Sequence, residues 1–375
     1  MIAACRIDLD AIRNNVANLA SRAPSAAVMA VVKADGYGHG MVPAARAALD
    51  GGASWLGVAV LAEAFGLRAA GIAAPVLAWL IGPDEELTDA IRQQIDVGVY
   101  AEPGLAAAAA AAHEVGAPAR VHLKVDTGLS RGGATAADWP GLLDAAAKAA
   151  ADRTVEVVGI WSHFAYADAP GHPTIGRQIT RFTDAVEVAE RAGVRPQLRH
   201  LANSAATLTL PAAHFDLVRP GIAAYGVSPG PDVGTPADFG LRPAMTLTGQ
   251  VVLAKRVAAG EGVSYGHRYT TPRDTRLALV PLGYADGIPR AASSTGEVLL
   301  GGRRRRIAGT VCMDQVVFDV GDDPVTAGDE AVFFGPGDAG EPTAQEWAEA
   351  LGTIGYEIVT RVGPRVPRVY TGGRK

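Results

Sequence analysis

The chain has 375 residues, of which 49% are hydrophobic, enough for one large domain and a smaller one. A net charge of −5 at pH 7 gives no basis for binding nucleic acid or a membrane surface. The spacing of the two cysteines, Cys5 and Cys312, fits neither a metal site nor a disulfide framework, so we expect a cytoplasmic protein without a metal. Arg6, Asp8 and Asp10 interrupt the apolar run that a signal peptide requires, and no apolar stretch is long enough to span a bilayer.

An amphipathic helix is predicted first, with Asp8 or Asp10 as its N-cap and Ile12, Val16 and Leu19 on one face. Short β-type runs then alternate with alanine-rich helical patterns. The β-type runs cover residues 28–32, 55–60, 76–80, 95–100, 120–125, 155–161, 198–201 and 215–218.

Eight strand–helix repeats predict an α/β fold, a closed parallel (β/α)₈ barrel of the TIM type. An open doubly wound sheet is the alternative. It is disfavoured because no Gly-x-Gly-x-x-Gly motif follows the first strand.

Proline, glycine and aspartate cluster over residues 227–239, which indicates a linker. Beyond it the helical period nearly disappears, and a small, mainly antiparallel β domain is predicted. The basic run 303–306 is interpreted as a solvated strand or turn. The β-type runs of this part cover residues 245–254, 277–281, 297–300, 316–320 and 331–334, and one helix covers 343–351.

Lys33 ends the first barrel strand, and Tyr37 follows in a glycine-rich turn. Only five of the 34 basic residues are lysines, so a lysine at this point suggests amine chemistry. A lysine can lose its proton and attack a carbonyl, whereas an arginine cannot. The alternative is a solvated lysine at the end of a strand.

The C-terminal ends of barrel strands meet at one face, where such folds place their chemistry. A planar, anionic cofactor with an aldehyde would suit the polar residues gathered there, with His163 stacked on its ring and Arg219 facing a ring nitrogen. His163 as a structural histidine and Arg219 as the partner of a nearby carboxylate are the alternatives. The residues at these strand ends are Lys33, Lys124 with Arg131, His163, His200 with Asn203 and Ser204, and Arg219.

In this interpretation Lys33 forms an imine with the aldehyde. Tyr37, Ser204 and the backbone amides of Gly221 and Ile222 hydrogen-bond a phosphate, and the glycine lets the backbone approach closely.

On these residues the chain resembles the alanine racemases, pyridoxal-phosphate enzymes of the barrel type (fold type III). The resemblance extends in order over essentially the whole chain. Its blocks are AVVKADGYGHG (30–40), KVDTG (124–128) with Arg131, SHFA (162–165), HLANSA (200–205), VRPGI (218–222), VSYG (263–266), GYADG (283–287), CMDQ (312–315) and GYE (355–357).

The resemblance implies that Lys33 carries pyridoxal 5'-phosphate as an internal aldimine, and that Lys33 and Tyr265 are bases on opposite faces of the α-carbon of alanine. It implies that Arg131 and Met313 receive the substrate carboxylate and that Lys124 is a candidate for carbamylation. The residues implied to hold the cofactor, besides Lys33, are Tyr37, His163, Asn203, Ser204, Arg219, Gly221, Ile222 and Tyr356.

The resemblance also implies a homodimer in which Tyr265 and Met313 reach the partner's barrel, and an enzyme that supplies D-alanine for peptidoglycan. The implied domains are the barrel over 10–230 and the β domain over 231–375, with a strand at 1–9 packed against the β domain. Thr310 departs from the family, because many relatives have arginine at this point of the substrate entrance.

Three alternatives remain within this resemblance. The first is a racemase for another amino acid, such as serine, or for a broader range. The second is a decarboxylase of the same fold, although its cysteine-bearing substrate motif is not found here. The third is a non-catalytic pyridoxal-phosphate carrier, which is a single barrel without the β domain.

Overall fold

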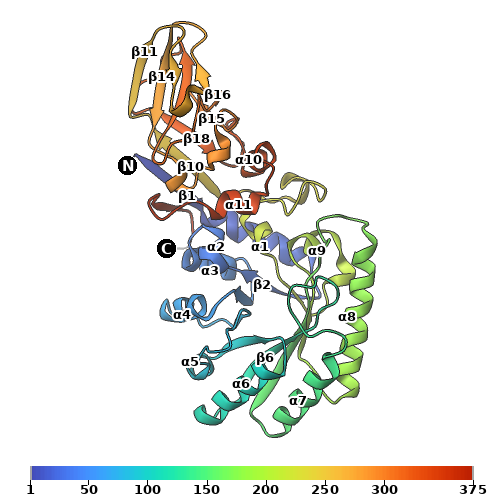
Figure 1. The fold of residues 1–375 in the computed structure, drawn as a ribbon. Helices are drawn as coiled ribbons and strands as arrows, with labels where there is room; N and C mark the ends of the chain where they lie inside the picture. Colours follow the sequence, from blue (N-terminus) through green and yellow to red (C-terminus); the bar gives the residue numbers. More distant parts are fainter. Residues whose placement is uncertain (1, 374–375) are drawn as a thin grey trace.

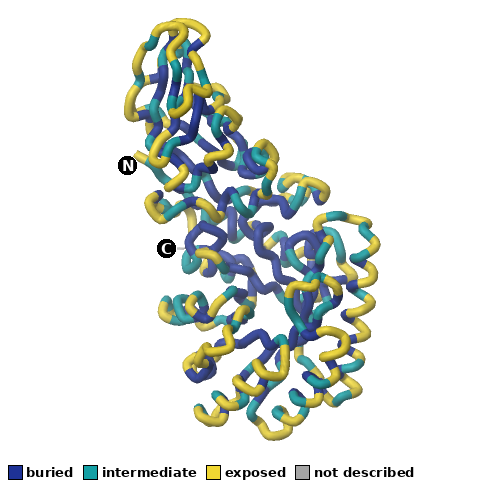
Figure 2. Tube along the Cα trace, in the orientation of Figure 1, coloured by how far each residue is buried: buried dark blue, intermediate teal, exposed yellow. Residues whose placement is uncertain are grey.

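The computed structural model describes residues 2–373, which form a barrel and a β-rich domain stacked on one end of it (Figure 1). Buried segments run continuously from the barrel strands into the β domain, while the outer faces of the helices are exposed (Figure 2). Over the described range, no helix has the length and apolar character needed to cross a membrane.

Eight parallel strands form the barrel in the order β8-β7-β6-β5-β4-β3-β2-β9. The backbone N–H of Asp216, beside β9, donates to the carbonyl of Arg199 in β8 (3.0 Å) and closes the sheet on itself. The predicted (β/α)₈ barrel is confirmed, and the open sheet is excluded. The strands are β2 (Ala27–Val31), β3 (Trp55–Val58), β4 (Val76–Ala78), β5 (Ile95–Val99), β6 (Ala119–Lys124), β7 (Val155–Trp161), β8 (Leu198–His200) and β9 (Leu217–Val218).

Alanine-rich helices cover the outside of the barrel (Figure 1). The alanine run 106–112 is helical, as its propensity predicts, and its helix ends at Gly116 with φ of 74°, a conformation that glycine adopts at little cost. The helices are α3 (Met41–Asp50), α4 (Leu61–Ala69), α5 (Thr88–Arg92), α6 (Glu102–Val115), α7 (Trp139–Ala151), α8 (Pro173–Arg191) and α9 (Ser204–Thr209).

The β domain is mainly antiparallel and is completed by the N-terminal strand β1 (Ala3–Asp8). This strand pairs antiparallel with β10 (Met245–Gln250) and parallel with β19 (Arg368–Thr371). The other strands of the six-stranded sheet are β15 (Glu297–Leu300), β16 (Arg303–Arg306) and β18 (Glu330–Phe334); a three-stranded sheet holds β11 (Leu253–Val257), β14 (Thr275–Val280) and β17 (Val316–Gly321), and a hairpin holds β12 (Gly262–Val263) and β13 (Tyr269–Thr270).

Two details of the β domain differ from the sequence prediction. The single run 245–254 is divided between β10 and β11, which belong to different sheets. A second helix, α11 (Gly355–Thr360), follows α10 (Ala344–Leu351) and was not predicted, because six residues are too few for a periodic pattern.

Helix α1 (Leu9–Arg22) joins the two parts, and Asp8 caps it by accepting a hydrogen bond from the N–H of Ala11 (3.0 Å). Its buried Asn15 donates to the carbonyls of Ala224 (3.2 Å) and Arg242 (2.9 Å). The same side chain accepts from the N–H of Arg242 (2.8 Å). One amide therefore fixes the end of the barrel to the start of the β domain.

Replacing Asn15 with alanine should lower the free energy of unfolding by about 3 kcal/mol, because the buried carbonyl of Ala224 and the part-buried backbone groups of Arg242 lose their partner. Asn18→Ala on the same helix is the control, with an expected loss of about 1 kcal/mol or less, since part of its hydrogen bonding is exposed. Denaturant titration measures both. Equal losses would contradict this role for Asn15.

Candidate active site

Lys33 begins a left-handed turn, α2 (Lys33–Tyr37), directly after strand β2. Ala34, Asp35 and Tyr37 have φ values of 52° to 53°, a region that costs a non-glycine residue roughly 1–2 kcal/mol. Such a run of strained residues persists only where the surroundings hold it. The sequence predicted a turn here but not its handedness.

Side chains on both sides of the turn hold it in place. Glu63 accepts from the N–H of Ala34 (2.6 Å), and Asp35 accepts from the N–H of Met41 (2.8 Å). The fully buried His39 places Nδ1 at 3.0 Å from the carbonyl of Gly36 and 2.9 Å from that of Tyr37, so Nδ1 carries the proton and donates. Burial lowers the pKa of His39 to about 4, and the ring stays neutral. Sequence analysis missed Glu63 and His39.

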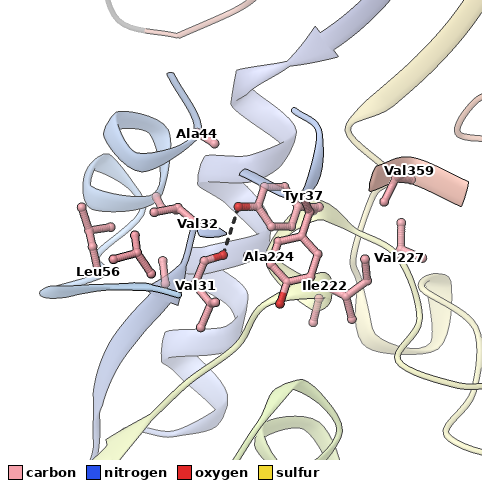
Figure 3. Close-up of a cluster of buried hydrophobic side chains, with 14 of the residues drawn as sticks. Val31, Val32, Tyr37, Ala44, Leu56, Ile222, Ala224, Val227 and Val359 are labelled. Carbon is pink, nitrogen blue, oxygen red and sulfur yellow. Dashed lines mark hydrogen bonds between the residues drawn. The ribbon is translucent and has the colours of Figure 1, made fainter. Parts of the chain in front are cut away.

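The turn places Tyr37 at one side of the barrel mouth, in a recess lined by Tyr37, Ser204, Gly221 and Tyr356 that we call the cup. Its ring belongs to the core cluster that also contains Val31, Ile222 and Val359 (Figure 3), and burial raises the pKa of its hydroxyl, which therefore remains a hydrogen-bond donor. A Cβ on Gly221 would collide with that hydroxyl. Only glycine allows the backbone to come this close.

The same cup contains Ser204 and Tyr356. The Ser204 hydroxyl accepts from the N–H of Gly221 (2.9 Å), and Asn203 holds the start of α9 by accepting from the N–H of Ala206 (3.1 Å). Tyr356 comes from α11, and its ring centroid lies 6.2 Å from that of Tyr37. Hydroxyls and backbone amides gathered at one point suit an anion with several oxygens.

The cup opens into a cavity of about 640 Å³ at the C-terminal ends of the barrel strands. Four cationic side chains line it, and the lining includes no aspartate or glutamate. The sequence-predicted residues that line the cavity are Lys33, Tyr37, Lys124, Arg131, His163, Asn203, Ser204, Arg219, Gly221, Ile222 and Tyr356.

Burial and mutual repulsion weaken the protonation of the lysines. Burial lowers the pKa of Lys33, Arg131 lowers it further, and Glu63 partly opposes this. Burial, Arg131 and Arg219 lower the pKa of Lys124 to about 8. The lowered pKa values make the neutral amine more accessible, which nucleophilic chemistry on a carbonyl requires.

Arg219 is a buried cation of the same cavity. Its Nη2 donates to the carbonyl of Ser162 (2.8 Å) and lies 3.4 Å from Nδ1 of His163. Burial lowers the pKa of Arg219 to about 9. Burial, Arg219 and the other nearby cations also lower the pKa of His163 well below its usual value, so His163 is neutral and can lie against a flat ring.

His200 does not line the cavity, contrary to the expectation from its position at a strand end. Its ring is fully buried, points into the barrel and bonds Nδ1 of His122 through Nε2 (2.8 Å). The alternation of side chains along a strand explains the difference, because a strand-end residue can face the barrel interior instead of the mouth.

Tyr265 and Met313 are also absent from the cavity lining and lie on the surface of the β domain. Their exposed fractions are 75% and 53%. The buried Thr310 donates from its hydroxyl to the carbonyl of Tyr265 (2.7 Å). Thr310 therefore holds the backbone under Tyr265 and contributes no charge.

The fold and the cavity define a class of protein: a barrel whose mouth holds the amine of Lys33, the cup on one side and the buried guanidinium of Arg219. Pyridoxal phosphate fits this set, because its aldehyde, phosphate and ring nitrogen match Lys33, the cup and Arg219.

Comparison with known proteins gives the family. The chain matches "Alanine racemase, N-terminal domain" over residues 7–229 and "Alanine racemase, C-terminal domain" over residues 244–370, and it belongs to the alanine racemase family. The family depends on pyridoxal phosphate, so the expected fold, cofactor and enzyme class, an isomerase, are confirmed.

Individual relatives agree over the full length. The alanine racemases of Frankia casuarinae and Salinispora arenicola are 66% and 63% identical, over 97% and 98% of this chain and 95% and 98% of theirs. The crystal structure of alanine racemase from Streptomyces lavendulae has a TM-score of 0.99 at 56% identity and covers 100% of this chain and 98% of that one. The structure from Streptomyces coelicolor A3(2) has a TM-score of 0.97 at 57% identity, covering 99% and 98%.

Gly221→Ala should weaken pyridoxal phosphate binding by about tenfold or more, because the new methyl displaces Tyr37 from the cup. Gly176→Ala on the exposed face of α8 is the control, since a Cβ there meets nothing within 4 Å. Absorbance titration of cofactor-free protein measures both affinities. Unchanged affinity in Gly221→Ala would show that the cup does not bind the phosphate.

Proposed function

We propose that this enzyme interconverts L- and D-alanine by moving one proton on each face of the α-carbon, with Lys33 and Tyr265 as the two bases. The observation that carries the proposal is the half-buried Lys33 amine in a cavity lined by cations and no carboxylate. Two bases on opposite faces avoid the need for one group to cross the substrate plane or exchange its proton with solvent.

The residues around the cavity would hold the cofactor through its functional groups. Lys33 would join to the aldehyde, Tyr37 and Tyr356 would donate to the phosphate, and Arg219 would face the ring nitrogen. When bound, pyridoxal phosphate withdraws electron density from the substrate α-carbon. The permanent charge of Arg219 discourages protonation of the ring nitrogen, which limits that withdrawal and favours return of the proton over side reactions. Asn203, Ser204, Gly221, Ile222 and His163 complete the set.

Arg131 would bind the substrate carboxylate, with the backbone of Met313 from the partner. The amine of Lys124 would first react with carbon dioxide to form a carbamate. The carbamate of Lys124 would then orient Arg131. Lys124 is buried against the rings of Tyr100 and Trp161, its Nζ 4.9 and 4.5 Å from their centroids, and it has no ion pair within the described range. A carbamate would turn this repelled cation into an anion beside Arg131.

Carbon-13 NMR after incubation with ¹³C-bicarbonate should show one carbamate signal in the wild type. Lys124→Arg, which keeps the charge but cannot form a carbamate, should lose both the signal and at least about tenfold in racemase activity. A wild type without the signal, or an arginine variant with normal activity, would contradict carbamylation.

The second base would come from a partner subunit. Tyr265, Tyr284 and Met313 are large side chains left exposed on the β domain. The backbone N–H of Tyr284 donates to the carbonyl of Cys312 (3.0 Å), and the hydroxyl of Thr310 donates to the carbonyl of Tyr265 (2.7 Å), so their loops are joined. A two-fold homodimer that buried this patch against the partner's barrel would place Tyr265 above the partner's Lys33.

We further propose the division into 1–9, 10–230 and 231–375, with the last part serving the partner's site. The free thiols of Cys5 and Cys312 fit a cytoplasmic enzyme. We propose that its product, D-alanine, is used for peptidoglycan.

Tyr356 and Met313 are large neighbours for a substrate side chain and favour a methyl group, so alanine should turn over faster than serine.

Wild-type enzyme with pyridoxal phosphate should convert L-alanine to D-alanine, and in D₂O it should exchange the α-hydrogen of both enantiomers. Tyr265→Phe should abolish exchange from L-alanine and retain exchange from D-alanine, because Lys33 still serves that face. Exchange is the informative measurement, since equal free energies of the enantiomers force kcat/KM to fall equally in both directions. Loss of exchange from both enantiomers alike would exclude separate bases.

Co-expressed Lys33→Ala and Tyr265→Phe chains should recover about a quarter of wild-type activity, because about half of randomly paired dimers are mixed and each has one intact site. Each variant alone should be nearly inactive. No recovery in the purified mixed dimer would place both bases in the same subunit.

A further inference from the structure

The interior of the barrel beneath the cavity contains ionisable residues where such barrels usually have Val, Ile and Leu. Asp96 in β5 is 1% exposed, and His122 in β6 and His200 in β8 are 0% exposed. A buried carboxylate and two buried imidazoles are costly unless every polar atom is hydrogen-bonded. Neither Asp96 nor His122 was predicted from the sequence, although Asp96 interrupts the otherwise apolar strand β5.

These residues form one continuous chain of hydrogen bonds that ends at Arg219. Oδ2 of Asp96 lies 3.1 Å from Nε2 of His122, and Nδ1 of His122 lies 2.8 Å from Nε2 of His200. Nδ1 of His200 lies 3.1 Å from Nη1 of Arg219. At the far end, Arg120 is ion-paired with Asp96 (2.8 Å).

Asp96 and Arg219, at the two ends of this series of hydrogen bonds, decide which ring nitrogens of His122 and His200 carry protons. The Asp96 carboxylate can only accept, so Nε2 of His122 carries a proton and its Nδ1 is bare. Nε2 of His200 must then donate to that bare nitrogen, which leaves Nδ1 of His200 bare to accept from Arg219. A doubly protonated ring at either position would put two donors face to face, so both histidines are neutral.

Two further observations show that the barrel accommodates this arrangement. A Cβ on Gly159 in β7 would collide with Nδ1 of His122 and lie 3.0 Å from Nε2 of His200, so glycine leaves the space between the rings. Arg219 has no ion pair with a carboxylate within the described range. Its connection to a negative charge therefore runs through His200 and His122 to Asp96.

We propose that Asp96 is a positioning residue for racemisation: through His122 and His200 it fixes the tautomer that gives Arg219 an acceptor, and so fixes the guanidinium that would face the cofactor's ring nitrogen. The proposal rests on the proposed role of Arg219. Asp96 does not line the cavity. A carboxylate that sets a histidine tautomer for a third group is an established catalytic device, and its loss is costly.

The test is Asp96→Asn, examined by ¹⁵N NMR of histidine-labelled protein with and without pyridoxal phosphate. In the wild type, His122 and His200 should each show a protonated Nε2 and a bare Nδ1. In Asp96→Asn an amide N–H can face His122, so the proton of His200 should move to Nδ1 or divide between both nitrogens. Racemase kcat should fall by about tenfold or more, with KM changed less than about twofold.

Glu156→Gln is the matched control. Glu156 forms the second ion pair of Arg120, at 3.2 Å, and takes no part in the hydrogen bonds that link Asp96 to Arg219. The tautomers of His122 and His200 and the value of kcat should therefore stay as in the wild type. His122→Asn is a second variant: its Oδ1 can take the place of Nδ1, accept from His200 and preserve the His200 tautomer.

Unchanged His200 tautomers in Asp96→Asn, or changed tautomers with normal kcat, would overturn the proposal. If Asp96→Asn unfolds, as judged by circular dichroism, a changed His200 tautomer in His122→Asn would overturn it instead. Wild-type protein with the expected tautomers but no racemase activity would refute the proposed function and leave the hydrogen-bond chain intact.

Discussion

The cavity at the barrel mouth depends on one electrostatic constraint: four cations share it with no carboxylate in its lining. Lys33, Lys124, Arg131 and Arg219 share a partly buried space, and burial together with repulsion from the arginines lowers the pKa values of the two lysines. A cofactor phosphate, a substrate carboxylate and a carbamate are the anions that would relieve it. Burial and the same repulsion keep His163 neutral and favour the uncharged Lys33 amine that covalent chemistry requires.

Much of this could be predicted from the sequence, because parallel strands impose strong patterns. Eight apolar runs separated by helical segments predicted the barrel, and the ends of several runs predicted residues at the mouth, although His200 faces the barrel interior instead. Lys33, His163 and Arg219 could be brought together in this way before any coordinates. The family resemblance added Tyr265 and Met313, for which the chain pattern offers no signal.

The rest depended on contacts that local sequence does not encode. The left-handed turn after Lys33 is held by Glu63 and His39, the first of which is distant in sequence. The series of hydrogen bonds that links Asp96 to Arg219 needs side chains from several strands, and it needs the space left by the missing Cβ of Gly159. The division of residues 245–254 between two sheets, and the exposure of Tyr265, follow from tertiary packing.

The central claim is that the Lys33 amine joins covalently to pyridoxal phosphate at the mouth of the barrel. Borohydride reduction of the loaded enzyme, followed by peptide mass mapping, tests it most directly. The account predicts a stable pyridoxyl adduct on the peptide that contains Lys33 and none on Lys124, although the pKa of Lys124 is also lowered. An adduct on Lys124, on another lysine or on none would contradict it.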